Sequence, residues 1–185
     1  MLKRFKSDKN FKFLFFFFIK GIALYLLWML VYDGWLVDTH WVNKTLINHL
    51  VAVNKWLLDA AGFITFRYDD IVGIDGSHGV FIGDPCNGLS LFALFAGFII
   101  AFTGKIKYKI PYIFFGVLVI HGLNILRIFG LTLLAKYRPE TLDFNHKYTF
   151  TIFIYGIIFL MWMLWVKKFA LLKSSKTEDR SPKSA

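Results

Sequence analysis

The chain has 185 residues, of which 57% are apolar and 22 are phenylalanine. A water-soluble domain of this size could not bury so much apolar surface, so the composition excludes an ordinary soluble protein and favours lipid as the solvent. The formal net charge of +10 would suggest a nucleic-acid partner in a soluble chain. Here the basic residues stand mostly at the ends of apolar runs, where they indicate membrane orientation, and we expect no nucleic-acid partner.

Four apolar stretches are long enough to cross a bilayer, which needs roughly 20 mostly apolar residues. Their approximate bounds are 13–32, 88–102, 110–135 and 148–166. No small-residue cleavage site follows the first stretch, which is typical of a retained anchor rather than a removed signal peptide. The sequence therefore predicts an all-α membrane protein with about four transmembrane helices, which form a domain over residues 13–166.

Basic residues cluster before the first span, between the second and third, and after the fourth. In a four-pass chain these clusters fall on one side, which the positive-inside rule identifies as cytoplasmic. The prediction is a multi-pass protein of the cytoplasmic (inner) membrane with both ends inside. Residues 1–12 form a basic cytoplasmic N-terminus, and residues 167–185 form a disordered basic cytoplasmic tail. The acidic segment 33–87 then lies outside.

The outer segment has two parts. Over residues 41–63, apolar residues alternate with four polar residues at helical spacing, which are Lys44, Asn48, Lys55 and Asp59. This pattern predicts an amphipathic helix that lies in the outer interface or packs on the helical bundle. Two short β-type runs, 66–74 and 79–82, then flank a turn at residues 75–78 that contains His78. We expect a short β-hairpin here, leading directly to Cys86.

Cys86 is the only cysteine, so the chain has no internal disulfide. A lone cysteine is most simply interpreted as a small buried hydrophobe. The topology, however, brings two cationic residues to its level. Cys86 precedes the second span at the outer surface, and Arg127 lies roughly 25 Å above Ile110 on an outward-running helix. His146 precedes the fourth span, again outside.

These residue types suit nucleophilic catalysis. A thiolate is the nucleophilic form of cysteine, and neighbouring cationic groups or a base favour it. His146 is the natural general base, because imidazole titrates near neutrality. Arg127 cannot act as a base, but it could hold a substrate carboxylate or stabilise an oxyanion. Asn124, one turn before it, could orient Arg127 or donate a hydrogen bond to substrate, and Asn87-Gly88 would open the helix after Cys86.

Simpler interpretations stay open for each residue. Arg127 could only snorkel to outer phosphates, and His146 could be a solvated loop residue. His121, near the middle of the third span, could be a contact between helices or a partner behind the site. His78 fits a turn residue. The sequence contains no clustered metal-ligand pattern, so we expect neither a metal nor another cofactor.

Three short strings resemble the motifs of one family. The segment Asp84-Pro85-Cys86-Asn87-Gly88-Leu89 resembles the Cys-x-Gly-Leu motif of the exosortase/archaeosortase family. Asn124-Ile125-Leu126-Arg127 resembles its Asn-x-x-Arg motif, and His146 its third motif. The resemblance covers about residues 65–165, in the same order and membrane placement. The chain is shorter than many members and lacks the acidic residue and glycine often found after the histidine, which is similar to short bacterial variants of the family.

The resemblance implies a membrane cysteine transpeptidase or protease. Such enzymes process a membrane-anchored substrate protein that carries a C-terminal sorting signal, of which PEP-CTERM is the best known. Cys86 would attack a backbone carbonyl and form a thioester, with Arg127 and His146 assisting, and a lipid or glycan would act as acceptor. Many members are encoded beside exopolysaccharide genes. The alternative is a non-catalytic subunit or scaffold of a polysaccharide or protein export system; a small transporter fits less well.

Overall fold

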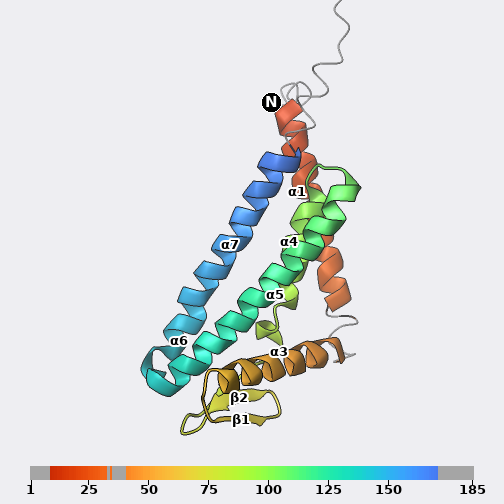
Figure 1. The fold of residues 1–185 in the computed structure, drawn as a ribbon. Helices are drawn as coiled ribbons and strands as arrows, with labels where there is room; N and C mark the ends of the chain where they lie inside the picture. Colours follow the sequence, from red (N-terminus) through yellow and green to blue (C-terminus); the bar gives the residue numbers. More distant parts are fainter. Residues whose placement is uncertain (1–8, 33, 35–40, 171–185) are drawn as a thin grey trace, which may run out of the picture.

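The computed structural model describes residues 9–32, 34 and 41–170. Most of the predicted N-terminus and of the predicted tail therefore lies outside the described residues. Figure 1 shows a mostly helical chain whose longer helices are α1 (Lys9–Val31), α3 (Trp41–Ala60), α4 (Leu89–Ala101), α5 (Ile106–Tyr137) and α7 (Phe150–Trp165). Each predicted span thus corresponds to a helix.

Two helical segments are long and apolar enough to cross a membrane, namely Ile106–Tyr137 and Pro139–Lys168. Helix α4 and the Phe15–Val31 part of α1 are apolar but shorter. Large apolar side chains point outward from these helices; Leu30 of α1 is 73% exposed and Ile152 of α7 is 70% exposed. Such surfaces suit lipid contact. The structure therefore supports a membrane protein, while the count of four spans stays a prediction.

The helices α4, α5 and α7 share a buried core, which we call the bundle core; it consists of Phe95, Ile99, Ile120, Ile154, Ile158, Met161 and Trp165. Helices α4 and α5 approach closely at Gly116, where a Cβ atom would lie 2.0 Å from Cε1 of Phe95. The Tyr112 hydroxyl donates a hydrogen bond to the carbonyl of Met161 at 2.7 Å, which joins α5 to α7. Apolar packing of aliphatic and aromatic side chains, together with this bond, holds the three helices together.

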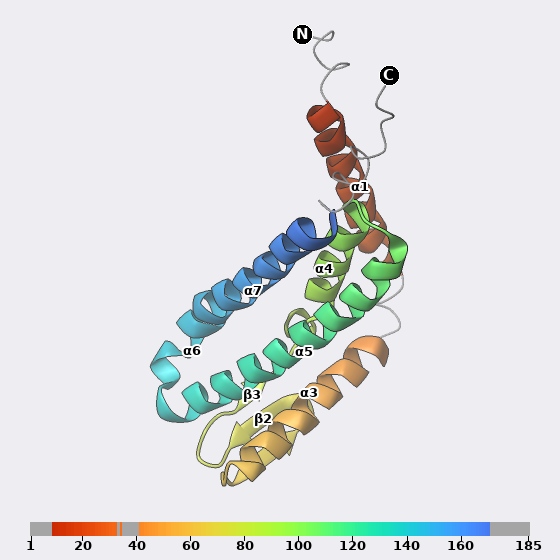
Figure 2. The ribbon, with the colours of Figure 1, turned by 45° about the horizontal axis from the view of Figure 1, so that its top comes forward.

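The connection between α4 and α5 lies at the same end of the molecule as the start of α1 and the end of α7 (Figures 1 and 2). Lys109 Nζ closes the C-terminus of α4 by donating to the carbonyls of Ile100 at 2.8 Å and Phe102 at 2.7 Å. A Cβ on Gly104 would lie 2.7 Å from Cζ2 of Trp165, so the connection touches α7. The basic residues that follow α4 and end α7 are therefore gathered at one end of the bundle.

The opposite end carries α3 and a small antiparallel sheet, with strands β1 (Thr65–Tyr68), β2 (Ile71–Ile74) and β3 (Val80–Phe81) in the order β1-β2-β3. The amphipathic helix predicted over 41–63 is confirmed as α3. It packs against α5 and the sheet, in agreement with the predicted alternative of a helix packed on the helical bundle. The outer core that they enclose consists of Ile47, Leu50, Val51, Leu58, Val72, Ile74, Ile82 and Ile128.

The predicted two-stranded hairpin is wrong in one respect, because the run 66–74 folds back on itself. Tyr68 pairs with Ile71, so Asp69 and Asp70 form a two-residue turn between β1 and β2. Asp69 takes φ +47°, which aspartate tolerates better than most residues. Lys44 Nζ donates to Asp69 at 2.8 Å and to Asp70 at 2.9 Å, which raises the pKa of Lys44. The turn predicted at 75–78 is present and joins β2 to β3.

Candidate functional site

Cys86 lies on a short connection between the sheet and the bundle. After β3 the chain forms a 3-10 turn over Asp84–Cys86, in which the N–H of Cys86 donates to the carbonyl of Gly83 at 2.9 Å. Helix α4 then begins after Gly88, which takes φ +89° as its N-cap. The Cys86 thiol is partly buried and packs against the outer core. One side of the residue is thus fixed by the sheet and the other by α4.

His146 lies in a helix rather than in the loop that the sequence analysis considered. The chain turns after α5 and passes through α6 (Leu142–Phe144) and a π-helical turn, Asn145–Thr149, before α7 begins. Single π-helical turns occur often at functional sites, because they rotate a side chain away from its α-helical direction. The predicted span from residue 148 therefore continues a helix that already contains His146.

The thiol and the imidazole are in contact. Sγ of Cys86 lies 3.4 Å from Nε2 of His146, although 60 positions separate the two residues in the sequence. This distance fits an S–H group donating to an unprotonated ring nitrogen. A nucleophile within hydrogen-bond reach of a base is the basic unit of cysteine-dependent catalysis.

Asn124 and Arg127 lie three residues apart on α5, so they share one side of that helix. Asn124 is fully buried, and its Nδ2 donates to the carbonyl of Cys86 at 2.8 Å. Asn124 therefore binds the backbone of the cysteine. The predicted roles were to orient Arg127 or to donate a hydrogen bond to substrate, and neither included this bond. The charge of Arg127 acts on the imidazole of His146. Arg127 is partly buried, and its Nε is buried without a hydrogen-bond partner among the described residues.

Asn87 supports the cysteine segment from the other side, through a bond to Asn43, which the sequence did not indicate as a site residue. Its Oδ1 accepts a hydrogen bond from the N–H of Leu89 at 2.9 Å, and its Nδ2 donates to Oδ1 of Asn43 at 2.7 Å. Asn43 lies on α3 and is 2% exposed. One signal could have identified it: Asn43 stands four residues before Ile47, on the stripe that α3 buries.

Two other histidines contact each other. Nε2 of His121 on α5 lies 3.2 Å from Nδ1 of His49 on α3. The prediction that His121 is a contact between helices is therefore confirmed. His78 lies between β2 and β3, in the predicted turn region. Within the described ranges, no three histidine, cysteine, aspartate or glutamate residues gather as they would around a metal ion.

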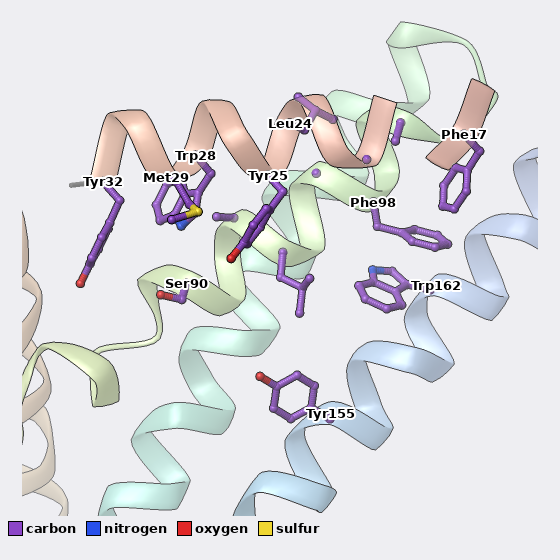
Figure 3. A pocket seen from close by; sticks show the side chains of 15 residues that line it. Phe17, Leu24, Tyr25, Trp28, Met29, Tyr32, Ser90, Phe98, Tyr155 and Trp162 are labelled. Atoms are coloured by element: carbon purple, nitrogen blue, oxygen red, sulfur yellow. The ribbon is translucent and has the colours of Figure 1, made fainter. Parts of the chain in front are cut away.

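A cavity of about 510 Å³ lies between α1, α4 and α7 (Figure 3). Its wall is apolar or aromatic apart from the hydroxyls of Ser90 and three tyrosines, and it does not include Cys86 or His146. Ser90 and Tyr32 stand at one end of the cavity and Phe98 and Trp162 toward the other (Figure 3). Ser90 is on the first turn of α4, so the cavity begins close in sequence to the cysteine.

One of three comparisons with known proteins identifies a family. The model of the transmembrane exosortase family (Exosortase_EpsH) matches residues 12–173. No curated protein and no solved structure matches the chain. The family match includes Cys86, Arg127 and His146 and covers most of the sequence. The chain therefore belongs to the transmembrane exosortase family.

Proposed function

We propose that this protein is a membrane-embedded cysteine peptidase or transpeptidase that processes C-terminal sorting signals of the PEP-CTERM type. The observation that carries the proposal is the 3.4 Å contact between Sγ of Cys86 and Nε2 of His146. Family membership supports a substrate that is itself a protein. The substrate would be anchored in the same membrane, so that its signal reaches Cys86 from the bilayer.

The proposed reaction has two steps. His146 takes the proton from Cys86, and the thiolate attacks a backbone carbonyl of the sorting signal, so that an S–C bond forms. When the tetrahedral intermediate collapses, the C–N bond breaks and His146 returns the proton to the departing amine. This leaves a thioester on Cys86. A hydroxyl or amine of a lipid or glycan acceptor, or water, then attacks the thioester, with His146 taking its proton and returning it to the thiol.

Arg127 would stabilise the negative oxygen that develops in both steps. A guanidinium retains its charge at any physiological pH, and Arg127 lies on α5 one turn from Asn124, which bonds the Cys86 carbonyl. Stabilisation of this kind acts most strongly in a site from which water is excluded. Asn124 would contribute indirectly, because its bond to the Cys86 carbonyl holds the nucleophile in place.

We further propose that the site faces the outer side of the cytoplasmic membrane, with four spans and both chain ends inside. The gathering of the α4–α5 connection and the end of α7 at one end of the bundle supports this orientation, since both carry lysines. The sheet and α3 lie toward the other end (Figure 1), and Cys86 packs against the outer core that they enclose.

A non-catalytic export subunit is the second candidate. Its support is the sequence after His146, where Lys147-Tyr148 replaces the acidic residue and glycine often found in the family. A scaffold would need its surface and its fold, but not a thiol next to an imidazole.

The two candidates differ in their response to single substitutions. The assay is the fraction of membrane proteins with a C-terminal helix that lose it, measured by mass spectrometry in the source bacterium. Cys86→Ala and Arg127→Ala should both abolish processing at normal protein abundance. Arg138→Ala is the matched control, because Arg138 lies exposed just after α5 and should leave processing unchanged. If both site variants process at the wild-type rate, the protein is not the proposed enzyme.

A further inference from the structure

Three buried asparagines converge on the segment that carries the thiol. Asn43 of α3 is 2% exposed, Asn87 is 1% exposed and Asn124 of α5 is fully buried. Burying a carboxamide is unfavourable unless its polar atoms find partners. Three such side chains around three consecutive residues, Cys86 to Gly88, therefore indicate a specific arrangement rather than general packing.

The hydrogen bonds form two supports for this segment. On one side, Asn124 Nδ2 donates to the carbonyl of Cys86 at 2.8 Å. On the other side, Asn87 uses both ends of its carboxamide, accepting from the N–H of Leu89 at 2.9 Å and donating to Oδ1 of Asn43 at 2.7 Å. Asn43 is thus the only link in this set between the cysteine segment and α3.

Packing alone does not account for an asparagine at position 43. The rest of the buried stripe of α3 is mostly aliphatic, with Ile47, Leu50 and Leu58 in the outer core. A leucine of similar size would pack there without a polar group to satisfy. Moreover, Asn43 Nδ2 has no hydrogen-bond partner in the part of the chain that the structure describes. Burying Asn43 therefore has an unfavourable desolvation free energy, and its one hydrogen bond, to Asn87, is what it provides in return.

We propose that Asn43 is a positioning residue: through Asn87 it holds Cys86 at hydrogen-bond distance from His146. This inference rests on the proposed role of Cys86 as nucleophile. Without the Asn43 oxygen, Nδ2 of Asn87 is left buried and unpaired. The segment then relieves that strain by moving away from α3, which displaces Sγ from its position 3.4 Å from Nε2 of His146. Asn43 touches neither the thiol nor the imidazole.

The test measures the thiol directly and needs no substrate. Because Cys86 is the only cysteine, the rate of alkylation of the full chain by iodoacetamide in native membranes reports on this thiol alone. Asn43→Leu should slow alkylation at neutral pH about fivefold, the factor expected when one net hydrogen bond of about 1 kcal/mol is lost. The matched control is Asn54→Leu. Asn54 is equally buried on the same helix, and its Nδ2 donates only to the Leu50 carbonyl, so the rate should stay within about twofold.

A second variant separates positioning from general loosening. His146→Gln should slow alkylation by itself, and adding Asn43→Leu to it should cause little further loss, because both act on the same contact. Independent, multiplicative effects would overturn the proposal. So would an unchanged rate in Asn43→Leu while His146→Gln is slow. An unchanged rate in His146→Gln would instead refute the proposed thiol–imidazole chemistry.

Protein that fails to fold also gives a decisive result. If Asn43→Leu does not accumulate, Asn43→Ser removes the contact with Asn87 while leaving a small polar side chain, and the same loss of about fivefold is expected. If both Asn43 variants fail to fold while Asn54→Leu and Asn54→Ser fold, Asn43 serves stability instead, and the positioning role is refuted.

Discussion

Replacing Gly88 by alanine should disturb the segment that carries Cys86, although the substitution adds only one methyl group. Gly88 has φ +89°, in the left-handed region where a Cβ collides with the following carbonyl oxygen. A Cβ there would also lie 3.2 Å from Nδ2 of Asn124. That nitrogen donates to the Cys86 carbonyl at 2.8 Å, so a shift of a few tenths of an ångström to make room would lengthen this bond.

Two contributions set the magnitude. The left-handed conformation costs a non-glycine residue about 1–2 kcal/mol. Weakening of the bond from Asn124 to Cys86 adds at most about 1 kcal/mol net. Together they amount to about 1–3 kcal/mol, which shifts the balance between the ordered and displaced segment by roughly 5- to 150-fold. Helix propensity cannot offset this, since Gly88 precedes the first turn of α4.

The assay compares Gly88→Ala with Gly97→Ala on the same helix. A Cβ at Gly97 meets no atom within 4 Å, and its backbone is helical, so that substitution should be tolerated. In detergent, Gly88→Ala should unfold at a lower temperature than wild type and should also lose substrate processing in cells. If the two variants behave alike in both measurements, the support that we assign to Gly88 and Asn124 is refuted.

Three further outcomes are expected. Gly116→Ala should destabilise the bundle by about 1–3 kcal/mol, because its Cβ would overlap the buried Phe95 ring. Gly122→Ala is the control, since a Cβ there has no atom within 4 Å and the variant should unfold like wild type. Similar melting temperatures for the two variants would contradict this packing. Hydrogen bonds from Lys55 and Thr65 lower the pKa of Asp59, so its contribution to stability is complete above its usual value of 3.8 and is lost as the pH falls through the lowered one. Asp59→Asn should therefore unfold with a weaker dependence on acid pH than wild type in chemical denaturation; an unchanged dependence would exclude this role. A membrane-impermeant maleimide should label Cys86 in intact spheroplasts, and labelling only after lysis would reverse the proposed orientation.

The helices could be predicted because lipid imposes a length and a composition that are visible in the sequence. Their ends could not be predicted as well. Helix α5 begins at Ile106 rather than near 110, because the lysines of its first turns can extend toward water while the backbone stays helical. Likewise, His146 was expected outside the helix because polarity marks where an apolar run ends, not where helical hydrogen bonding ends.

The candidate site divides in the same way. Topology alone predicted that Cys86, Arg127 and His146 share one end of the molecule, since helical rise converts sequence distance into depth. The hydrogen bonds of Asn124 and Asn43 could not be predicted, because they depend on side-chain directions across helices that only tertiary packing fixes. The Asp69-Asp70 turn was missed for a related reason: its left-handed residue is an aspartate rather than a glycine, and Lys44 stabilises it from 25 positions away.

The central claim is that the thiol of Cys86 performs the reaction, and reversible blocking tests it most directly. Methyl methanethiosulfonate adds a small S-methylthio group to this single cysteine, and dithiothreitol removes it. In native membranes that contain the substrate, processing should fall in proportion to the fraction of Cys86 blocked, reach zero at full modification and return after reduction. Processing that continues at the wild-type rate with Cys86 fully blocked would contradict the claim.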